Sequence, residues 1–256
     1  MIHPNLYRQP VVLDSATHRD LKIGTPMNSW QAAAQVHGII IAAVEFADVS
    51  LDYPILFVDT GKDEQGQRHV APIAAFGLSD KENLFVDGEH WRARYIPAMI
   101  RAYPFGITRV ETDKTLIMID DAWPNWSRSE GTPLFNAQGE PSQELNAVRD
   151  QLQKIEMEIQ RTRFFGDALL EAGLLMDMRF EATLPSGEQI TADGFMSVDD
   201  KKLMELPDAK VVELHRNGVL SLIHAHQISM CHMQKLVDWK AQLAQAAVGA
   251  SEGSKT

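Results

Sequence analysis

Residues 179–196 read Arg-Phe-Glu-Ala-Thr-Leu-Pro-Ser-Gly-Glu-Gln-Ile-Thr-Ala-Asp-Gly-Phe-Met. Two strand candidates, residues 179–184 and 189–196, flank the turn formers Pro185-Ser186-Gly187-Glu188 in this stretch. Turn residues between two such segments indicate a β-hairpin, in which the strands are antiparallel. A chain that uses hairpins of this kind is expected to build an antiparallel sheet.

Further strand candidates occur along the chain, and several of them face each other across turn residues. Residues 211–215 and 219–223 flank Arg216-Asn217-Gly218, and Asn-Gly is the strongest short hairpin signal. The other candidates are residues 36–44, 55–58, 70–78, 82–86, 107–110 and 115–119, the last two around the turn Glu111-Thr112-Asp113-Lys114. Because the strands come in hairpin-like groups, the sheets are expected to be largely antiparallel.

The clearest helix signals come late in the chain. A long helix is predicted from Pro141-Ser142 to about Leu175, because apolar residues recur there at helical spacing and Ser142 suits an amino-terminal cap. Shorter helices are expected from Pro97 to Tyr103 and from Asp199-Asp200 to Leu206, with a final helix over residues 227–247. Since strict strand–helix alternation is absent, we predict an α+β fold with a long central helix and a C-terminal helix.

The division of the chain follows from the residues that break regular structure. Residues 1–30 are predicted to be an irregular segment, because proline and glycine recur in them. Residues 31–247 are expected to form a single α+β domain, with residues 125–142 as the best place for a weak subdivision. Residues 248–256 are small and polar, and we predict that they form a flexible tail.

Composition excludes several classes of protein. Lys and Arg number 24 against 35 Asp and Glu among 256 residues, which gives a net charge of −11, so a general nucleic-acid binder is not expected. The most apolar run, residues 38–44, is far shorter than the ~20 residues that span a bilayer. The amino terminus has no secretory signal pattern and Cys231 has no disulfide partner, so we expect a soluble cytoplasmic protein without a transmembrane segment.

Histidines form one candidate site. On strands, His224 and His226 would point to the same face, and His215 on a neighbouring strand could complete a metal site. The spacing is loose, however, and histidines at a strand-to-helix junction commonly bond to backbone, so structural roles are favoured and the three histidines are weak metal candidates. The sequence has none of the common phosphate, dinucleotide, zinc-protease or nucleophile motifs, so it names no catalytic residue and no cofactor.

Arginines interleaved with aromatic residues form the second candidate site. We call this set the arginine–aromatic block: Trp91, Arg92, Arg94, Tyr95, Arg101 and Tyr103. The guanidinium group of arginine can form paired hydrogen bonds with a carboxylate or a phosphate, and the faces of aromatic rings stack on planar groups. The other interpretation is that the aromatic residues fill the core and the arginines pair with acids, which are Glu45, Asp48, Asp52, Glu82 and Asp87.

Several stretches in and around the block carry a resemblance to a known family. They are Glu45-Phe46, Asp52-Tyr53-Pro54-Ile55, residues 82–87, residues 91–98, residues 101–105, Pro133-Leu134-Phe135, Gly139-Glu140, residues 199–203 and residues 218–229. Together they resemble the SapC family of bacterial proteins over about residues 30–240. The most specific part of the likeness is the segment from Trp91 to Phe105.

The resemblance implies a biological context. The family takes its name from a component linked to the bacterial surface layer, and its members occur near genes for outer-membrane receptors and halogenase-like enzymes. The resemblance therefore implies an accessory role in a cell-surface or outer-membrane-related system. It brings no catalytic motif to carry over onto this chain.

Three hypotheses of function follow, from different classes of protein. The leading one is an accessory interaction protein that binds a protein or peptide partner through the arginine–aromatic block, and that could form a homo-oligomer. The alternative is a metal-dependent or anion-binding enzyme, built around His226 with His224 or His215, that acts on a small molecule or peptide. A purely structural lattice subunit is the third.

Overall fold

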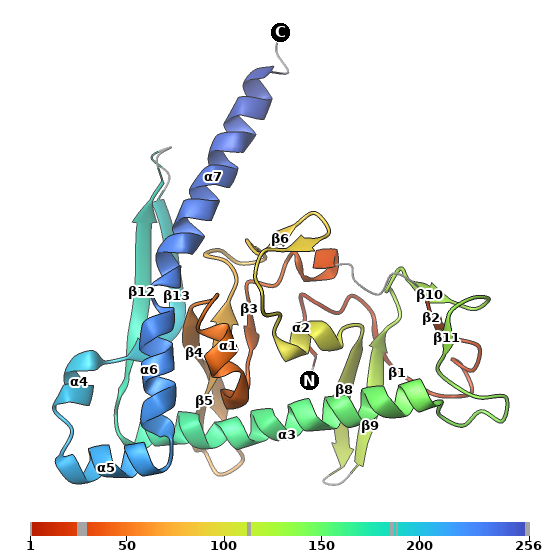
Figure 1. Cartoon of the computed structure of the whole chain (residues 1–256), viewed down its shortest axis with the longest axis horizontal. Helices are drawn as coiled ribbons and strands as arrows, with labels where there is room; N and C mark the ends of the chain where they lie inside the picture. Colours follow the sequence, from red (N-terminus) through yellow and green to blue (C-terminus); the bar gives the residue numbers. More distant parts are fainter. Residues whose placement is uncertain (1, 25–29, 112–113, 185–186, 188, 254–256) are drawn as a thin grey trace.

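The computed structural model describes residues 2–24, 30–111, 114–184, 187 and 189–253, and it shows antiparallel sheets packed with helices (Figure 1). The largest sheet has five strands. In spatial order they are β12 (Leu175–Thr183), β13 (Gln189–Val198), β4 (Ile55–Lys62), β5 (Arg68–Ala75) and β3 (Gly38–Ile40). Every pair in it is antiparallel. The predicted α+β fold with largely antiparallel sheets is therefore confirmed.

The hairpin predicted over residues 179–196 forms the outer pair of this sheet. Strand β12 pairs with β13 from Leu175 opposite Val198 to Thr183 opposite Gln189. The turn residues Pro185, Ser186 and Glu188 lie outside the described residues. The hairpin forms because local turn chemistry and strand-forming residues agree at this place.

Smaller sheets hold the amino-terminal part of the chain. They comprise β1 (Pro10–Val12), β9 (Lys114–Asp120) and β8 (Phe105–Glu111); β10 (Trp126–Ser127), β2 (Lys22–Ile23) and β11 (Thr132–Pro133); and β6 (Val86–Asp87) with β7 (His90–Trp91). The predicted pairing of residues 107–110 with 115–119 is confirmed, while Thr112 and Asp113 of its turn lie outside the described residues. Parts of the segment predicted to be irregular therefore pair as strands, and only Val86 of the predicted strand 82–86 lies in one.

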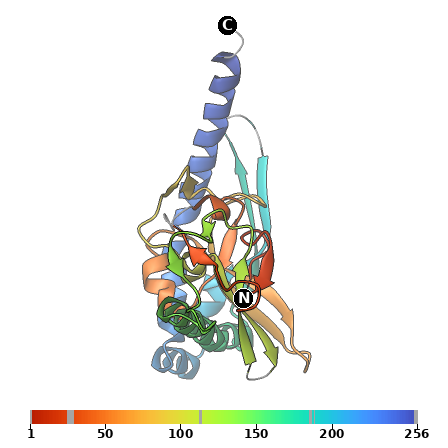
Figure 2. The same ribbon diagram turned by 90° about the vertical axis from the view of Figure 1, so that its right-hand side faces the viewer.

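Long helices frame the sheets, as predicted. Helix α3 (Gln143–Glu171) begins at Ser142, whose hydroxyl accepts the N–H of Leu145 (3.1 Å). Helix α7 (His232–Gly253) runs along the β12–β13 hairpin and extends beyond it (Figures 1 and 2), while residues 254–256 of the predicted tail lie outside the described residues. The shorter helices are η1 (Trp30–Ala33), η2 (Ala43–Glu45), α1 (Phe46–Val49), α2 (Ala98–Ala102) and α4 (Asp200–Met204).

The hairpin predicted around Asn217-Gly218 is wrong. Those residues join two helices, α5 (Asp208–Arg216) and α6 (Val219–Ser229). Gly218 has a left-handed backbone (φ +82°) and Asn217 accepts the N–H of Val219 (3.1 Å). Asn-Gly supports a left-handed residue at a helix end as readily as it supports a tight hairpin.

Within the described ranges, the buried apolar residues form two clusters that α3 connects. Leu145 and Leu152, in the amino-terminal half of α3, pack with β8 and β9 in one cluster. Phe165 and Leu169, in the other half, pack with the five-stranded sheet and α6. Because it contributes to both clusters, α3 fixes the positions of the surfaces on either side of it. Among the described residues, no helix combines the length and the apolar character needed to cross a membrane.

Candidate functional site

The tryptophan end of the arginine–aromatic block belongs to the core. The Trp91 indole N–H donates to the hydroxyl of Tyr53 (2.6 Å), which is fully buried. Its ring lies edge-on to Phe76 (5.3 Å between centroids) and stacks on Phe85 (6.3 Å). Trp91 therefore attaches the β6–β7 hairpin to the core, which is the structural interpretation of this residue.

The two arginines beside Trp91 differ in their partners. Arg92 donates to Asp87 (2.9 Å) and lies 5.3 Å over the ring of Trp239, so an acid and an aromatic face already match its charge. The backbone N–H of Arg94 donates to the carboxylate of Asp52 (3.2 Å). Within the described residues, the exposed guanidinium of Arg94 has no hydrogen bond or ion pair.

Tyr95 is held by a buried carboxylate. Glu45 is 4% exposed, and its Oε1 accepts the hydroxyl of Tyr95 (2.9 Å) and the N–H of Ala98 (2.8 Å). Its Oε2 accepts the N–H of Ala42 (2.9 Å). Burial and the nearby charge of Glu45 raise the pKa of Tyr95 to about 12, so the hydroxyl stays protonated and donates. The expected pairing of Glu45 with an arginine is therefore wrong, because one hydroxyl and two backbone N–H groups saturate it.

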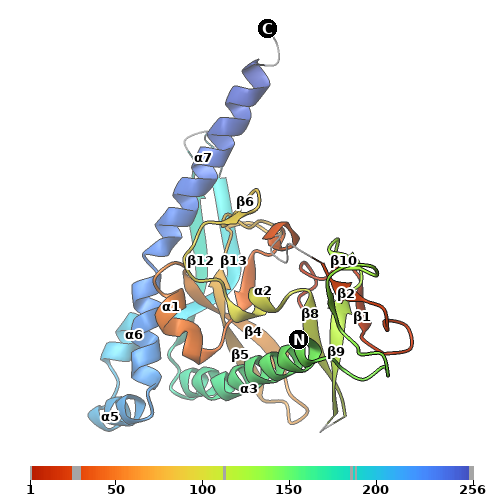
Figure 3. The ribbon, with the colours of Figure 1, turned by 45° about the vertical axis from the view of Figure 1, so that its right-hand side comes forward.

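Tyr95 and Arg101 meet in a pocket of about 190 Å³. We call it the α2–α3 pocket, because α2 lies over the middle of α3 there (Figure 3). The Arg101 guanidinium lies 5.5 Å over the Tyr95 ring and 3.5 Å from its hydroxyl. Lys154 of α3 and the exposed Val44 also line this pocket.

Two cations line the α2–α3 pocket without an acid partner among the described residues. In the part of the chain that the structure describes, neither Arg101 nor Lys154 forms an ion pair, and Glu158, the half-buried acid of the lining, is bonded to Arg161 (2.6 Å). Glu45 is buried beneath Tyr95 and saturated. An anionic group entering the pocket therefore meets two cations that are not already paired with a protein carboxylate.

Tyr103 packs against the apolar cluster that contains residues of β8 and β9. Its hydroxyl donates to Asp120 (2.8 Å), and both burial and this carboxylate raise the pKa of Tyr103. Asp120 is fully buried and also accepts the backbone N–H groups of Arg8 (3.0 Å) and Gln9 (2.8 Å). Tyr103 and Asp120 thus tie the amino-terminal segment to β9. Tyr103 therefore has a structural role, whereas Tyr95 lines the α2–α3 pocket, although both residues belong to the block.

The histidines lie on helices, so the geometry predicted for a shared metal is wrong. His215 lies on α5, while His224 and His226 lie two residues apart on α6 and therefore point to different sides. His226 is 1% exposed; its Nε2 accepts the N–H of Val198 (3.1 Å) and its Nδ1 donates to the carbonyl of Ile55 (2.6 Å).

Both ring nitrogens of His226 are therefore occupied, and burial lowers its pKa, which keeps the ring neutral. His226 joins α6 to β4 and β13 as a structural residue. Across the described ranges, no group of three or more His, Cys, Asp or Glu side chains is arranged to hold a metal ion.

Comparison with protein families identifies the family to which this chain belongs. The SapC family model matches residues 13–236, which is nearly the whole chain. The protein belongs to the SapC family. The matched range includes the complete arginine–aromatic block and Lys154 of the α2–α3 pocket. Neither a curated protein nor a solved structure matches this SapC-family chain.

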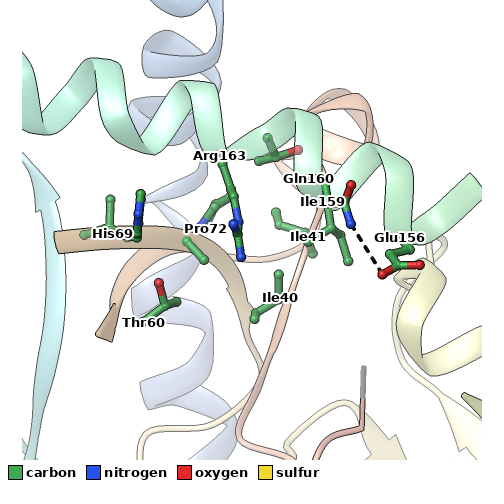
Figure 4. A pocket seen from close by; sticks show the side chains of 12 residues that line it. Ile40, Ile41, Thr60, His69, Pro72, Glu156, Ile159, Gln160 and Arg163 are labelled. Atoms are coloured by element: carbon green, nitrogen blue, oxygen red, sulfur yellow. Dashed lines mark hydrogen bonds between the residues drawn. The ribbon is translucent and has the colours of Figure 1, made fainter. Parts of the chain in front are cut away.

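A second pocket of the SapC-family protein lies on another side of α3, and the sequence gives no motif that predicts it. The pocket has about 280 Å³ and lies between α3 and the β3–β5 edge of the large sheet (Figure 4). We call it the α3–β5 pocket. His69 and Thr60 line it from the sheet, and Arg163 lines it from the helix.

His69 of the α3–β5 pocket is clamped between two carboxylates. Its Nδ1 lies 2.9 Å from Asp167 and its Nε2 lies 3.1 Å from Asp63. The hydrogen bonds with Asp63 and Asp167 raise the pKa of His69. Since Asp167 lies 98 residues away in the sequence, spacing alone could not reveal this arrangement.

Proposed function

We propose that this SapC-family protein is an accessory interaction protein that binds an acidic segment of a protein partner in the α2–α3 pocket. One observation carries the proposal: Tyr95 and Arg101 of the block meet Lys154 in a pocket where, among the described residues, both cations lack an acid partner. Guanidinium groups bind carboxylates through paired, charge-assisted hydrogen bonds. Because the chain as a whole carries a charge of −11, such a site offers acidic groups a local exception to the general repulsion.

Apolar side chains around the pocket support a protein as the partner. Val44 at the pocket is 65% exposed, and Ala42, Ala98 and Ile155 line the pocket beside it. Tyrosine and arginine dominate the binding energy of protein interfaces when apolar contacts shield them from water. A peptide that places a carboxylate on Arg101 can therefore bury apolar area on Val44 in the same contact.

We further propose that the partner belongs to a cell-surface or outer-membrane-related system and that the protein acts on it from the cytoplasm. The support for the system is the context of the family. The support for the compartment is the low cysteine content, with Cys231 as the single cysteine of the sequence.

Photo-crosslinking in the native cells tests the proposed function. A photoreactive phenylalanine derivative replaces Val44, and a matched control places it at Met204, which is 79% exposed and lies on α4 away from the pocket. We expect a discrete crosslinked partner from position 44 alone, attached through a peptide rich in Asp and Glu. The combined substitutions Arg101→Ala and Lys154→Ala should abolish that product.

Three outcomes would contradict the proposal. They are equal crosslinking from positions 44 and 204, a product from position 44 that survives the double substitution, and the absence of a product from position 44. Arg101 and Lys154 are surface residues without ion pairs in the described structure, so the double variant is expected to fold normally.

A further inference from the structure

We propose that the α3–β5 pocket binds a small monocarboxylate with an apolar body, and that Arg163 holds the carboxylate. This inference goes beyond the proposed function, because it concerns another side of α3 and shares no residue with the α2–α3 pocket. Its test is therefore independent of the test of partner binding.

The floor of the pocket is apolar and comes from three elements. Ile40 and Ile41 lie at and just after the end of β3, Pro72 lies on β5, and Ile159 lies on α3. Figure 4 shows these side chains grouped beneath the helix. A concave volume of about 280 Å³ with such a lining favours the hydrocarbon part of a small ligand.

One cation of this pocket has no acid partner among the described residues. Glu156 bonds to Arg109 (3.1 Å), and His69 is paired with two aspartates, which leave one negative charge over even when its ring is protonated. Among the described residues, the Arg163 guanidinium has no hydrogen bond or ion pair. Figure 4 shows Arg163 reaching from α3 across the pocket, so it can present its fork to a carboxylate whose apolar body lies on the isoleucines.

The surrounding acids favour a single negative charge on the ligand. Asp63 and Asp167 hold His69 at one end of the pocket, and Glu156 lies at the other. A dianion such as phosphate would need more donors than one unpaired guanidinium and would meet repulsion from these carboxylates. Thr60, which lines the pocket from β4, offers a neutral hydroxyl as a second donor for the same carboxylate.

The walls of the pocket are held in place by close contacts. A Cβ atom at Gly166 would lie 2.4 Å from the carbonyl oxygen of Val70, so glycine allows α3 to approach β5 this closely. Thr162 accepts the N–H of Ala43 (2.8 Å), which joins α3 to η2. The pocket is therefore formed before a ligand arrives, which lowers the entropic cost of binding.

Binding of octanoate to the full-length protein tests this inference, with octan-1-ol as the uncharged control. Isotope-labelled isoleucine methyl groups report the site by NMR. We expect saturable octanoate binding with shifts at Ile40, Ile41 and Ile159, and much weaker binding of octan-1-ol. Arg163→Gln should weaken octanoate by roughly tenfold or more without changing octan-1-ol, because it removes a charge-assisted contact. The matched control Arg161→Gln, on the same helix but paired with Glu158, should leave both unchanged.

Several results would overturn the inference. They are no octanoate binding, equal affinity for octanoate and octan-1-ol, equal losses for the two arginine variants, and saturable shifts confined to other isoleucines. Failure of this experiment leaves the crosslinking test of the α2–α3 pocket unaffected, because the two sites share no residue.

Discussion

Both ends of the arginine–aromatic block place an arginine beside aromatic rings, but the environments of the two arginines differ. At one end, Arg92 is paired with Asp87 and lies over Trp239, and Trp91 is packed against the core. At the other end, Arg101 lies over Tyr95 and has no acid partner among the described residues. Pairing of the arginine with a carboxylate, and not the arginine–aromatic pattern itself, therefore separates scaffold from candidate site.

The largest effect on stability is expected at the tryptophan end. Trp91→Ala should lower the free energy of unfolding by about 3 kcal/mol, because it removes a large packed ring and leaves the hydroxyl of Tyr53 without its donor. Trp91→Phe, which keeps most of the packing, should cost about 1 kcal/mol. Urea unfolding measures both variants. A negligible loss for Trp91→Ala would assign Trp91 to the surface and remove the contrast between the two ends.

A smaller loss is expected where Tyr103 meets Asp120. Asp120→Asn should lower the free energy of unfolding by about 2 kcal/mol, because the amide places a donor among groups that all donate to this position. Affinity for an acidic peptide should not change. Loss of peptide affinity in a variant of native stability would mean that Tyr103 belongs to the binding end of the block.

Local patterns made much of the fold predictable. The hairpin over residues 179–196 and the helix that begins at Ser142 depend on turn, cap and periodicity signals within one segment. The Asn217-Gly218 prediction failed because a left-handed glycine is compatible with both a hairpin and a helix end.

The candidate sites were less predictable, because their contacts join distant residues. Tyr95 bonds to Glu45, 50 residues away, and His69 bonds to Asp167, 98 residues away. His226 bonds to Ile55, 171 residues away. Sequence analysis could therefore identify Tyr95, Arg101 and His226 as notable residues, but only the tertiary structure assigns their partners.

A still smaller effect on the free energy of unfolding, which depends on pH, is expected at His69 in the α3–β5 pocket. The raised pKa of His69 stabilises the fold at pH values below its unfolded pKa near 6.5, and this contribution disappears as pH rises through the folded pKa. The lowered pKa of Asp63, caused first by its bond to His69, contributes above its unfolded value near 3.8 and is lost as pH falls through the folded value. The contacts of His69 with Asp63 and Asp167 therefore stabilise the fold most at pH values between the unfolded pKa of Asp63, near 3.8, and the unfolded pKa of His69, near 6.5.

Comparison of the wild type with His69→Gln measures this effect. The difference in their free energies of unfolding should be larger at about pH 5.5 than at about pH 8.5. A difference that stays constant with pH, or that grows at high pH, would show that His69 is not held as a cation between Asp63 and Asp167.

The contrast between the two ends of the block is tested most directly by peptide affinity. Fluorescence anisotropy with a labelled hexaglutamate peptide compares Arg101→Ala with Arg92→Ala, each of which removes one positive charge, so general electrostatic attraction changes equally. We predict that Arg101→Ala weakens binding about tenfold, whereas Arg92→Ala changes it less than about twofold. Equal losses for the two variants, a larger loss for Arg92→Ala, or no binding by the wild type would contradict the assignment of the Tyr95–Arg101 end as the binding site.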